Sequence, residues 1–323
     1  MKAVSIDKFG GVDELKFTDV PIPDIGIGQV LVRVSYAGVN PVDWKIREGY
    51  LEKLFPHAFP LIPGWDMSGV IEAMDKSVTE FKPGDKVYSH IQPQPIQYGT
   101  YAEFTPADAS AVSHMPSNLD FAEAASIPLA MLTAWQALVE IAELKKGENI
   151  LVCAGAGGVG GFAIQIAKYI GANVLTTASA SNHDYVQTLG ADIAIDYNAE
   201  DINAEIYKFV NNGVDVVFDC TGVTDVEENI SYVRKGGGGR YITICGQPDV
   251  MPALESLGSE FQINAELVFV KPNGQTLQGI TKLIEEGHLK PLPVEEYSLK
   301  EAKTAQIKSA EGHVRGKLVV RVQ

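Results

Sequence analysis

The sequence has few cysteines, and they show no pairing pattern. Among 323 residues there are three, Cys153, Cys220 and Cys245, which lie far apart and form no Cys-X-X-Cys pair. Their number and spacing give neither a disulfide framework nor a cysteine-rich metal site. Each lies within an apolar run typical of a strand, so we interpret them as small buried core residues in a reducing compartment.

Positive charge and unbroken apolar segments are also scarce. Lys and Arg number 26 against 41 Asp and Glu, a net charge of −15, and the basic residues are scattered. Such a chain repels a polyanion, so nucleic acid is not expected as the main partner. The longest apolar candidate for a membrane span, residues 150–172, is broken by its own glycines, and the start has no apolar stretch of signal-peptide length. We therefore expect a soluble, cytoplasmic protein with no membrane partner.

The pattern of apolar and turn-forming residues changes near residue 121. Before that point, short alternating segments are separated by Gly and Pro, which is typical of a partly open β-barrel. After it, apolar strand-like runs alternate with helical segments, as in a doubly wound parallel sheet. The last strand-like run, "GKLVVRV", has a partner only in the first part of the chain. We predict an α/β protein with two domains, residues 1–122 with 271–323, and residues 123–270.

A glycine-rich stretch carries the strongest motif. In "LVCAGAGGVGG" an apolar strand runs into Gly155-X-Gly157-X-X-Gly160, and an apolar-faced helix follows. In a dinucleotide-binding motif the first glycine allows a tight turn, the second lets the backbone approach a pyrophosphate, and the third lets helix and strand pack closely. A flexible turn between two buried elements is the simpler alternative. The surrounding strand, turn, helix and second strand favour dinucleotide binding, with Gly158 and Val159 also at the phosphates.

The residues after the second strand bear on the choice of cofactor. NAD enzymes place an acid there to accept from the ribose 2′-hydroxyl. This chain has Ser179 and Ser181 and no carboxylate before Asp184. Hydroxyls can donate to a 2′-phosphate, so the sequence favours NADPH, although no Arg or Lys stands in this segment.

Several motifs in one order resemble the medium-chain dehydrogenase/reductase superfamily. They are "AGVNPVDWKIREG", "IPGWDMSGVI", "FKPGDKVY", "GTYAEF", "IPLAMLTAWQAL", "AGAGGVGGFAIQIAK", "GVDVVFDCTG" and "HVRGKLVV". Their wording is similar to the zinc-free quinone oxidoreductase branch, and especially to the alkenal and enone reductases that share "NPVDWK". The resemblance implies a GroES-like barrel domain, a Rossmann domain that binds NADP, and usually a homodimer formed edge to edge through "AELVFVK".

The same resemblance implies that no catalytic metal is present. Asn40, Trp65 and Leu129 stand where the zinc alcohol dehydrogenases of the superfamily have their ligands. Zinc requires Cys, His or carboxylate donors that converge, and Asp66 alone cannot hold it. The six histidines show no metal-ligand spacing.

Without a Lewis acid, oxidation of an unactivated alcohol is difficult, whereas an electrophilic acceptor needs only a hydride donor and hydrogen-bond donors for its oxygen. We therefore expect an NADPH:quinone oxidoreductase or enone (alkenal) reductase. The resemblance implies that Asn40 and Lys45 stabilise the anion that forms, and we expect Asp43 to orient Lys45 or the loop backbone. A solvated lysine at the end of a strand is the alternative for Lys45.

Further cofactor contacts follow from the resemblance and from the ends of strands. Thr133 resembles a position near the nicotinamide and Tyr197 one near the adenosine phosphate, with a helix-bonded Thr and a buried aromatic as the alternatives. Cys245 and Gly246 are expected at the end of the fifth strand and Val270 at the end of the sixth. Trp44, Tyr50 and Trp65 could line an apolar pocket or belong to the core.

Two other functions remain open. One is a catalytically idle NADPH-binding protein that acts through partners, which the Asn40 and Lys45 loop argues against. The other is an enoyl-thioester reductase, which would need a basic mouth for the carrier phosphates that this acidic chain does not offer.

Overall fold

The computed structural model describes residues 1–198, 201–221, 226–244 and 250–323. The chain divides into two compact units, Met1–Leu132 with Lys271–Gln323, and Thr133–Val270. The sequence placed the first boundary earlier, at residue 122, where the barrel-like texture ends. The short helix α2 (Phe121–Ala125) nevertheless belongs to the first unit, because it packs against five of that unit's strands.

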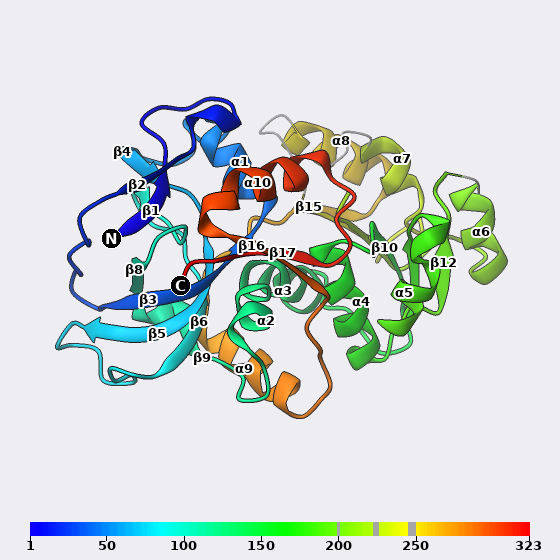
Figure 1. Cartoon of the computed structure of the whole chain (residues 1–323). Coiled ribbons are helices and arrows are strands. Elements are labelled where there is room, and N and C mark those ends of the chain that lie inside the picture. The colour runs from blue at the N-terminus through cyan, green and yellow to red at the C-terminus, as the bar shows by residue number, and fades with distance from the viewer. Residues whose placement is uncertain (199–200, 222–225, 245–249) are drawn as a thin grey trace. The chain divides into compact units, whose positions relative to one another are not determined.

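The first unit is built on one large sheet, whose last strand in the chain returns to its first long strand (Figure 1). In spatial order the sheet contains β16 (Val294–Ser298), β17 (Lys317–Arg321), β3 (Gln29–Val39), β5 (Asp66–Met74), β6 (Lys86–His90) and β9 (Val112–His114), and β8 (Phe104–Asp108) pairs with β3. Its pairs are antiparallel except β16 with β17. The terminal run "GKLVVRV" is thus paired as the sequence suggested, with Leu318 opposite Val39.

Two small sheets and several helices complete this unit. The sheets are β1 (Lys2–Ser5) with β2 (Lys16–Asp19), antiparallel, and β4 (His57–Ile62) with β7 (Ile96–Tyr98), parallel. The helices are α1 (Pro41–Arg47), α2, α9 (Gly274–Glu285) and α10 (Ala302–Glu311), with 3-10 turns at Val12–Glu14, Ala109–Ala111 and Leu299–Glu301.

Alternation in β3 explains the core of the first unit. Val30, Val32 and Val34 are fully buried, whereas the residues between them are partly exposed. Because successive side chains of a strand point to opposite faces, these valines form one face, and they pack with Met67 and Ile71 of β5.

The second unit is a six-stranded parallel sheet with helices. Its strands, in spatial order, are β12 (Ile193–Ile195), β11 (Asn173–Thr177), β10 (Asn149–Cys153), β13 (Val216–Asp219), β14 (Arg240–Thr243) and β15 (Asn264–Leu267). Its helices are α4 (Gly158–Ile170), α5 (His183–Thr188), α6 (Ile202–Phe209), α7 (Val226–Ser231) and α8 (Val250–Phe261), with a π-helix at Gln136–Ile141 and a 3-10 turn at Ala180–Asn182. The helix α3 (Pro128–Trp135) spans the division between the units.

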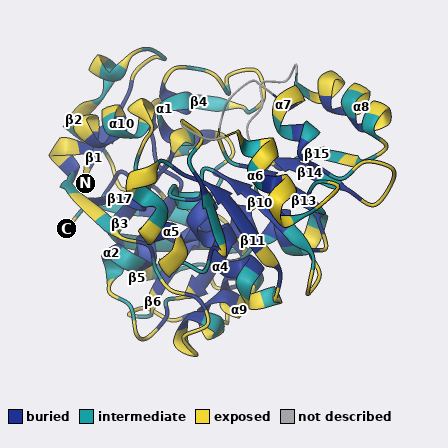
Figure 2. Ribbon diagram, turned by 90° about the vertical axis from the view of Figure 1, so that its right-hand side faces the viewer, coloured by how far each residue is buried: buried dark blue, intermediate teal, exposed yellow. Residues whose placement is uncertain are grey.

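The strand order identifies where a ligand is expected in this unit. From β10 the chain proceeds to β11 and β12 on one side, and then crosses to β13 on the other. The loops after β10 and β13 therefore leave the sheet at its topological switch point, where open α/β sheets bind ligands. The strands themselves are largely buried, as Figure 2 shows for β10 and β11, so the doubly wound Rossmann fold expected from the sequence is confirmed.

Candidate active site

The glycine-rich turn lies at this switch point, between β10 and α4. The sequence predicts that the first glycine of the motif allows a tight turn, but none of the five glycines from Gly155 to Gly161 has a positive φ, and the left-handed residue is Ala154, with a φ of 59°. Close packing requires the first and third glycines of the motif, and for the third this is the role that the sequence predicts. A Cβ on Gly155 would lie 2.0 Å from Thr176 Oγ1, and one on Gly160 would lie 2.4 Å from the carbonyl oxygen of Ala154.

Gly157 differs from its two neighbours in the motif. The nearest protein atom to a Cβ built there is the carbonyl oxygen of Ala154 at 3.4 Å, which is an ordinary contact. The fold of the chain therefore does not require glycine at this position, whereas the close approach of a ligand to the backbone would. Gly157 also precedes α4 and offers no side-chain cap to it. The first-turn N–H groups, including those of Gly158, Val159 and Gly160, thus suit a phosphate group.

Hydroxyl and amide groups gather after the next strand, β11. The Oγ atoms of Ser179 and Ser181 lie 3.3 Å apart, and Asn182 Nδ2 donates to Ser179 Oγ over 3.1 Å. Asn182 was not among the residues expected from the sequence, which offers no motif for it. Tyr197 follows β12 at the same carboxyl edge of the sheet, and 47% of it is exposed.

The other expected cofactor residues have different outcomes. Thr133 is buried in α3. Val270 was expected to end the sixth strand, which is wrong, because β15 ends at Leu267 and the chain runs on without regular structure. Cys245 and Gly246 lie outside the described residues, after β14.

In the first unit, the predicted catalytic residues lie in α1 and at its N-cap. Asn40 follows β3 and is the N-cap residue of this helix, and Pro41 is its first residue, where a missing N–H costs little. Asp43 Oδ2 accepts from the backbone N–H of Asn40 over 2.8 Å and from the Tyr101 hydroxyl over 3.0 Å. Asp43 thus contacts the loop backbone, one of the two roles expected for it, and forms no recorded bond to Lys45.

A chain of buried polar contacts surrounds the Asn40 side chain. Lys317 Nζ donates to Asn40 Oδ1, and Asn40 Nδ2 donates to Asp66 Oδ2 over 2.8 Å. The other oxygen of Asp66 accepts from the backbone N–H of Leu129 over 2.8 Å. Lys317, Asn40 and Asp66 are each at most 5% exposed. Sequence reasoning missed Lys317 and Tyr101; the only signal was a lysine inside the apolar terminal strand of "HVRGKLVV".

Burial changes the acidity of these groups. Removal from water, opposed by hydrogen bonds from Asn40 and Tyr101, raises the pKa of Asp43 to about 7. Burial likewise raises the pKa of Asp66 to about 6, although the charge of Lys317 opposes this change. The pKa of Lys317 is lowered by burial, while the two carboxylates act in the opposite direction. Two acids and one base therefore share a site with little access to water.

Lys45 extends from α1 into different surroundings. It is partly exposed, and its Nζ lies 5.6 Å from the centroid of the Trp44 ring, which meets Tyr50 edge-on at 5.9 Å. Among the described residues, no carboxylate forms an ion pair with Lys45. Trp65, by contrast, is 1% exposed and packs against Phe55, as a core residue.

These residues do not fit a zinc ion. Both polar atoms of the Asn40 amide are engaged by Lys317 and Asp66, and Trp65 has no group that ligates zinc. Within the part of the chain that the structure describes, no three His, Cys, Asp or Glu residues lie close enough together to hold a metal ion.

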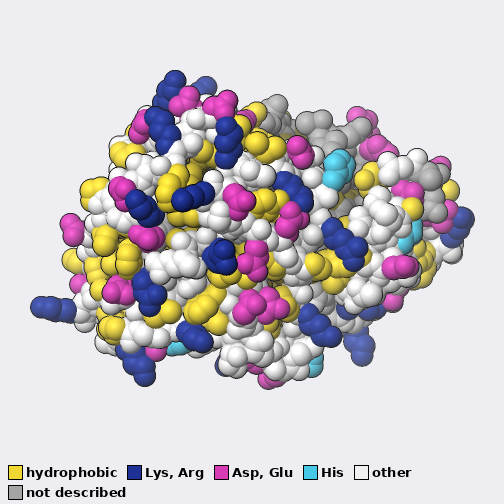
Figure 3. Space-filling model, viewed as in Figure 1, with side chains coloured by type: hydrophobic (Ala, Val, Ile, Leu, Met, Phe, Trp, Pro, Cys, Tyr) yellow, Lys and Arg dark blue, Asp and Glu magenta, His cyan; other side chains and the backbone are white. Residues whose placement is uncertain are grey.

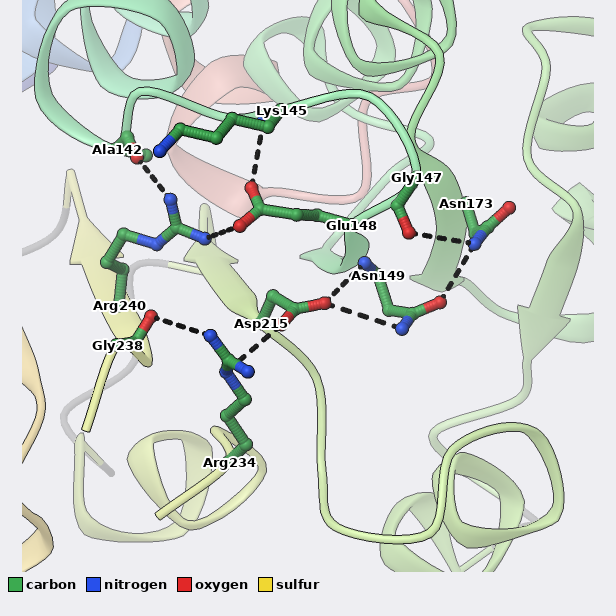
Figure 4. A network of polar contacts seen from close by, with 10 residues as sticks. All are labelled: Ala142, Lys145, Gly147, Glu148, Asn149, Asn173, Asp215, Arg234, Gly238 and Arg240. Atoms are coloured by element: carbon green, nitrogen blue, oxygen red, sulfur yellow. Dashed lines mark hydrogen bonds and ion pairs between the residues drawn. The ribbon is translucent and has the colours of Figure 1, made fainter. Parts of the chain in front are cut away.

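A polar network with a structural role lies at the other end of the parallel sheet, where its strands begin (Figure 4). Arg240 bonds Glu148 and the carbonyl of Ala142, and Arg234 pairs with Asp215. These groups lie at the amino ends of β10, β13 and β14, beside a groove of about 930 Å³. Each of the two arginines beside this groove has a carboxylate partner.

Charges of both signs are mixed on one face of the molecule. On the face shown in Figure 3, Lys and Arg side chains are interspersed with Asp and Glu. No helix within the described ranges combines the length and the apolar character needed to cross a membrane.

The nucleotide-binding sheet and the barrel-like first unit define a two-domain dehydrogenase architecture, and comparison with known proteins agrees. Residues 26–117 match the family model of the alcohol dehydrogenase GroES-like domain, and residues 189–320 match that of a zinc-binding dehydrogenase. The chain is 36% identical over 299 residues to an NADPH-dependent alkenal/one oxidoreductase, chloroplastic, from Arabidopsis thaliana, covering 90% of this chain and 71% of that protein.

Two further relatives match over almost their full length. The quinone-oxidoreductase QR1, chloroplastic, from Triphysaria versicolor is 34% identical over 99% of this chain and 98% of its own. The structure of the quinone oxidoreductase from Coxiella burnetii superposes with a TM-score of 0.88 at 33% identity, covering 100% of this chain and 99% of that one. The protein belongs to the quinone oxidoreductase branch of the medium-chain dehydrogenase/reductase family.

Proposed function

We propose that the protein is a zinc-independent reductase that uses NADPH to reduce a quinone or the β-carbon of an α,β-unsaturated carbonyl. The names of its relatives support this class of reaction. The observation that carries the proposal is Lys45, an ammonium with no carboxylate partner among the described residues. It lies in the last turn of α1, a helix whose first turn is held by buried groups.

Each unit supplies one requirement of this chemistry. Gly155, Gly157, Gly158, Val159 and Gly160 of the second unit would hold the pyrophosphate of the cofactor, which when bound supplies a hydride. Lys45 and Asn40 of the first unit would donate hydrogen bonds to the acceptor oxygen as it gains negative charge. Preorganised donors of this kind act mainly on the transition state. The enolate or hydroquinone anion then takes up one proton.

The preference for NADPH, the oligomeric state and the location are parts of the same proposal. Ser179, Ser181 and Asn182 offer hydrogen-bond donors to a 2′-phosphate, and no carboxylate in this segment would repel it. We expect NADPH to bind more tightly than NADH, the chain to form a homodimer, and the protein to act in the cytoplasm.

The test is turnover of a panel of acceptors. An enone, an alkenal, a quinone and an enoyl thioester are each mixed with the protein and NADPH, and the loss of nicotinamide absorbance is followed. Reduction of the enone or quinone is expected. Tight NADPH binding without reduction of any acceptor would contradict the proposal and indicate a cofactor-binding protein without this activity.

A substitution at Lys45 tests the proposed role of its ammonium. Lys45→Met should lower kcat for the enone about 100-fold, since removal of one oxyanion donor typically costs a factor of about 100 to 1,000. The Kd for NADPH should change less than about twofold, because the phosphate site lies on the other unit. Lys53→Met, at an exposed lysine nearby, is the matched control and should retain full activity. Equal losses of kcat and NADPH affinity in Lys45→Met would show a structural role instead.

A further inference from the structure

Lys317 is a buried cation with specific partners. It opens β17, is 5% exposed, and its Nζ donates to Asn40 Oδ1 and, over 3.2 Å, to the carbonyl of Val39. Because a buried ammonium is costly unless it is hydrogen-bonded, its partners matter, and one of the two is the side chain of Asn40, a predicted catalytic residue.

The partners of the Asn40 amide hold it in one orientation. Lys317 has only donors, and ionised Asp66 has only acceptors. A rotation of the amide by half a turn would place its NH₂ group against the ammonium and its carbonyl against the carboxylate. Both contacts would be repulsive inside the protein, where charges are poorly screened. Asp66 is itself fixed by the backbone N–H of Leu129.

This orientation leaves one N–H of the Asn40 amide available to another partner. The carbonyl oxygen is occupied by Lys317, and one Nδ2 hydrogen is donated to Asp66. Among the described residues, none accepts the second hydrogen of Asn40 Nδ2. The hydrogen-bonded chain from ammonium through amide to carboxylate also polarises the amide.

We propose that Lys317 is a positioning residue of the reductase site: with Asp66 it locks the Asn40 amide so that Asn40 can meet the acceptor oxygen only as a hydrogen-bond donor. The inference rests on the proposed function and adds to it. A site with a fixed amide donor and the Lys45 ammonium favours an acceptor whose oxygen becomes anionic, and it offers no amide carbonyl to accept a proton from an alcohol.

A double-mutant cycle tests this assignment in the full-length protein. Lys317→Met should lower kcat for the enone about tenfold, with the Kd for NADPH unchanged, and Lys317→Arg should restore most of the activity. In an Asn40→Ala background Lys317→Met should cause no further loss, because Lys317 acts through Asn40. A loss that is as large in that background as in the wild type would overturn the proposal.

Removal of the ammonium alone could unfold the chain, since it leaves Asp66 buried without a cation. The neutral pair Asp66→Asn with Lys317→Met removes both charges, and it should fold yet show the same loss of kcat. Lys308→Met, on the exposed side of α10, is the control and should behave as the wild type.

A second readout does not depend on turnover. The side-chain amide resonances of Asn40, assigned by their loss in Asn40→Ala, should shift in Lys317→Met and stay unchanged in Lys308→Met. Unchanged resonances in Lys317→Met would contradict the locking. If the wild type reduces no acceptor while these resonances do shift, the proposed function fails but the contact of Lys317 with Asn40 stands.

Discussion

The buried carboxyl of Asp43 is held by two donors and yet lacks a counter-ion in contact with it. One of its oxygens accepts from Asn40 N and Tyr101, and the other has no recorded partner although it is buried. An ionised carboxylate there would be poorly solvated on one side, which agrees with the direction of its pKa. At neutral pH this residue is thus close to the balance between its two protonation states.

The stability of the protein should therefore depend on pH through Asp43. Its pKa rises from 3.8 to about 7 on folding. Between these values the native state keeps a proton that the unfolded state has lost, so stability falls as pH rises from about 4 to about 7. The slope for one proton is at most about 1.4 kcal/mol per pH unit. In Asp43→Asn this contribution disappears, and the difference in unfolding free energy from the wild type should change across that window.

Denaturant unfolding at several pH values measures this difference. Asp75→Asn is the control, because hydrogen bonds lower the pKa of Asp75 to about 2 and its contribution changes only below about pH 4. If the curves of wild type and Asp43→Asn ran parallel from pH 4 to 7, a proton on Asp43 in the native state would be ruled out.

At the scale of elements, the turn between β10 and α4 uses its glycines for two different purposes. Gly160 is required by the packing of the chain on itself, whereas Gly157 faces no close protein atom. Gly157→Ala should therefore fold with a midpoint of thermal unfolding within a few degrees of the wild type, but bind NADPH at least about tenfold more weakly, since a lost close contact of 1.4 kcal/mol has that effect.

Gly160→Ala provides the contrast to this variant. Its Cβ would lie 2.4 Å from a backbone oxygen, so the helix and the strand must separate, and the midpoint of unfolding should fall clearly. Both properties can be measured by thermal denaturation and by fluorescence titration with NADPH. A Gly157→Ala protein that binds NADPH as the wild type does would argue against the pyrophosphate site.

The elements also show what the sequence could and could not predict. The strand, glycine turn and helix from Asn149 to Ile170 follow from local patterns, because apolar runs and glycine spacing are local properties. The pairing of Lys317 with Asn40, 277 residues apart, depends on the register of β17 on β3, which no local pattern gives. The same holds for Tyr101 and Asp43, whose contact joins a loop to helix α1.

Local patterns also predicted part of the physical basis of the glycine motif. The close packing at Gly160 was predicted, whereas the first glycine was expected to allow a tight turn. The left-handed residue is Ala154, and Gly155 is required by its close approach to Thr176. Steric demands of this kind arise from neighbours such as Thr176 on the adjacent strand. They become visible only when the strands are paired.

At the scale of the whole molecule, the parallel sheet, as formed by the described residues, has an unpaired edge at β15. This strand lies at the edge of the sheet, and its residues are mostly half-buried. An unpaired edge with accessible backbone groups is a template for another strand. A second copy of the chain, related by a two-fold axis, could pair with it through the same residues.

We predict that the protein is a dimer of twice its chain mass of 34.8 kDa, measured by light scattering after gel filtration. The N–H groups of Asn264 and Val268 point to β14, where they bond Gly239 and Thr243, so by alternation that of Ala265 points to the open edge. Ala265→Pro removes this outward donor and should give a monomer. Ala194→Pro is the control at the opposite edge, in β12. The carbonyl of Ile195 there accepts from the N–H of Ala178 and so faces β11, which by alternation leaves the N–H of Ala194 outward, and this variant should remain a dimer. A wild-type monomer, or equal dissociation by both prolines, would contradict assembly through β15.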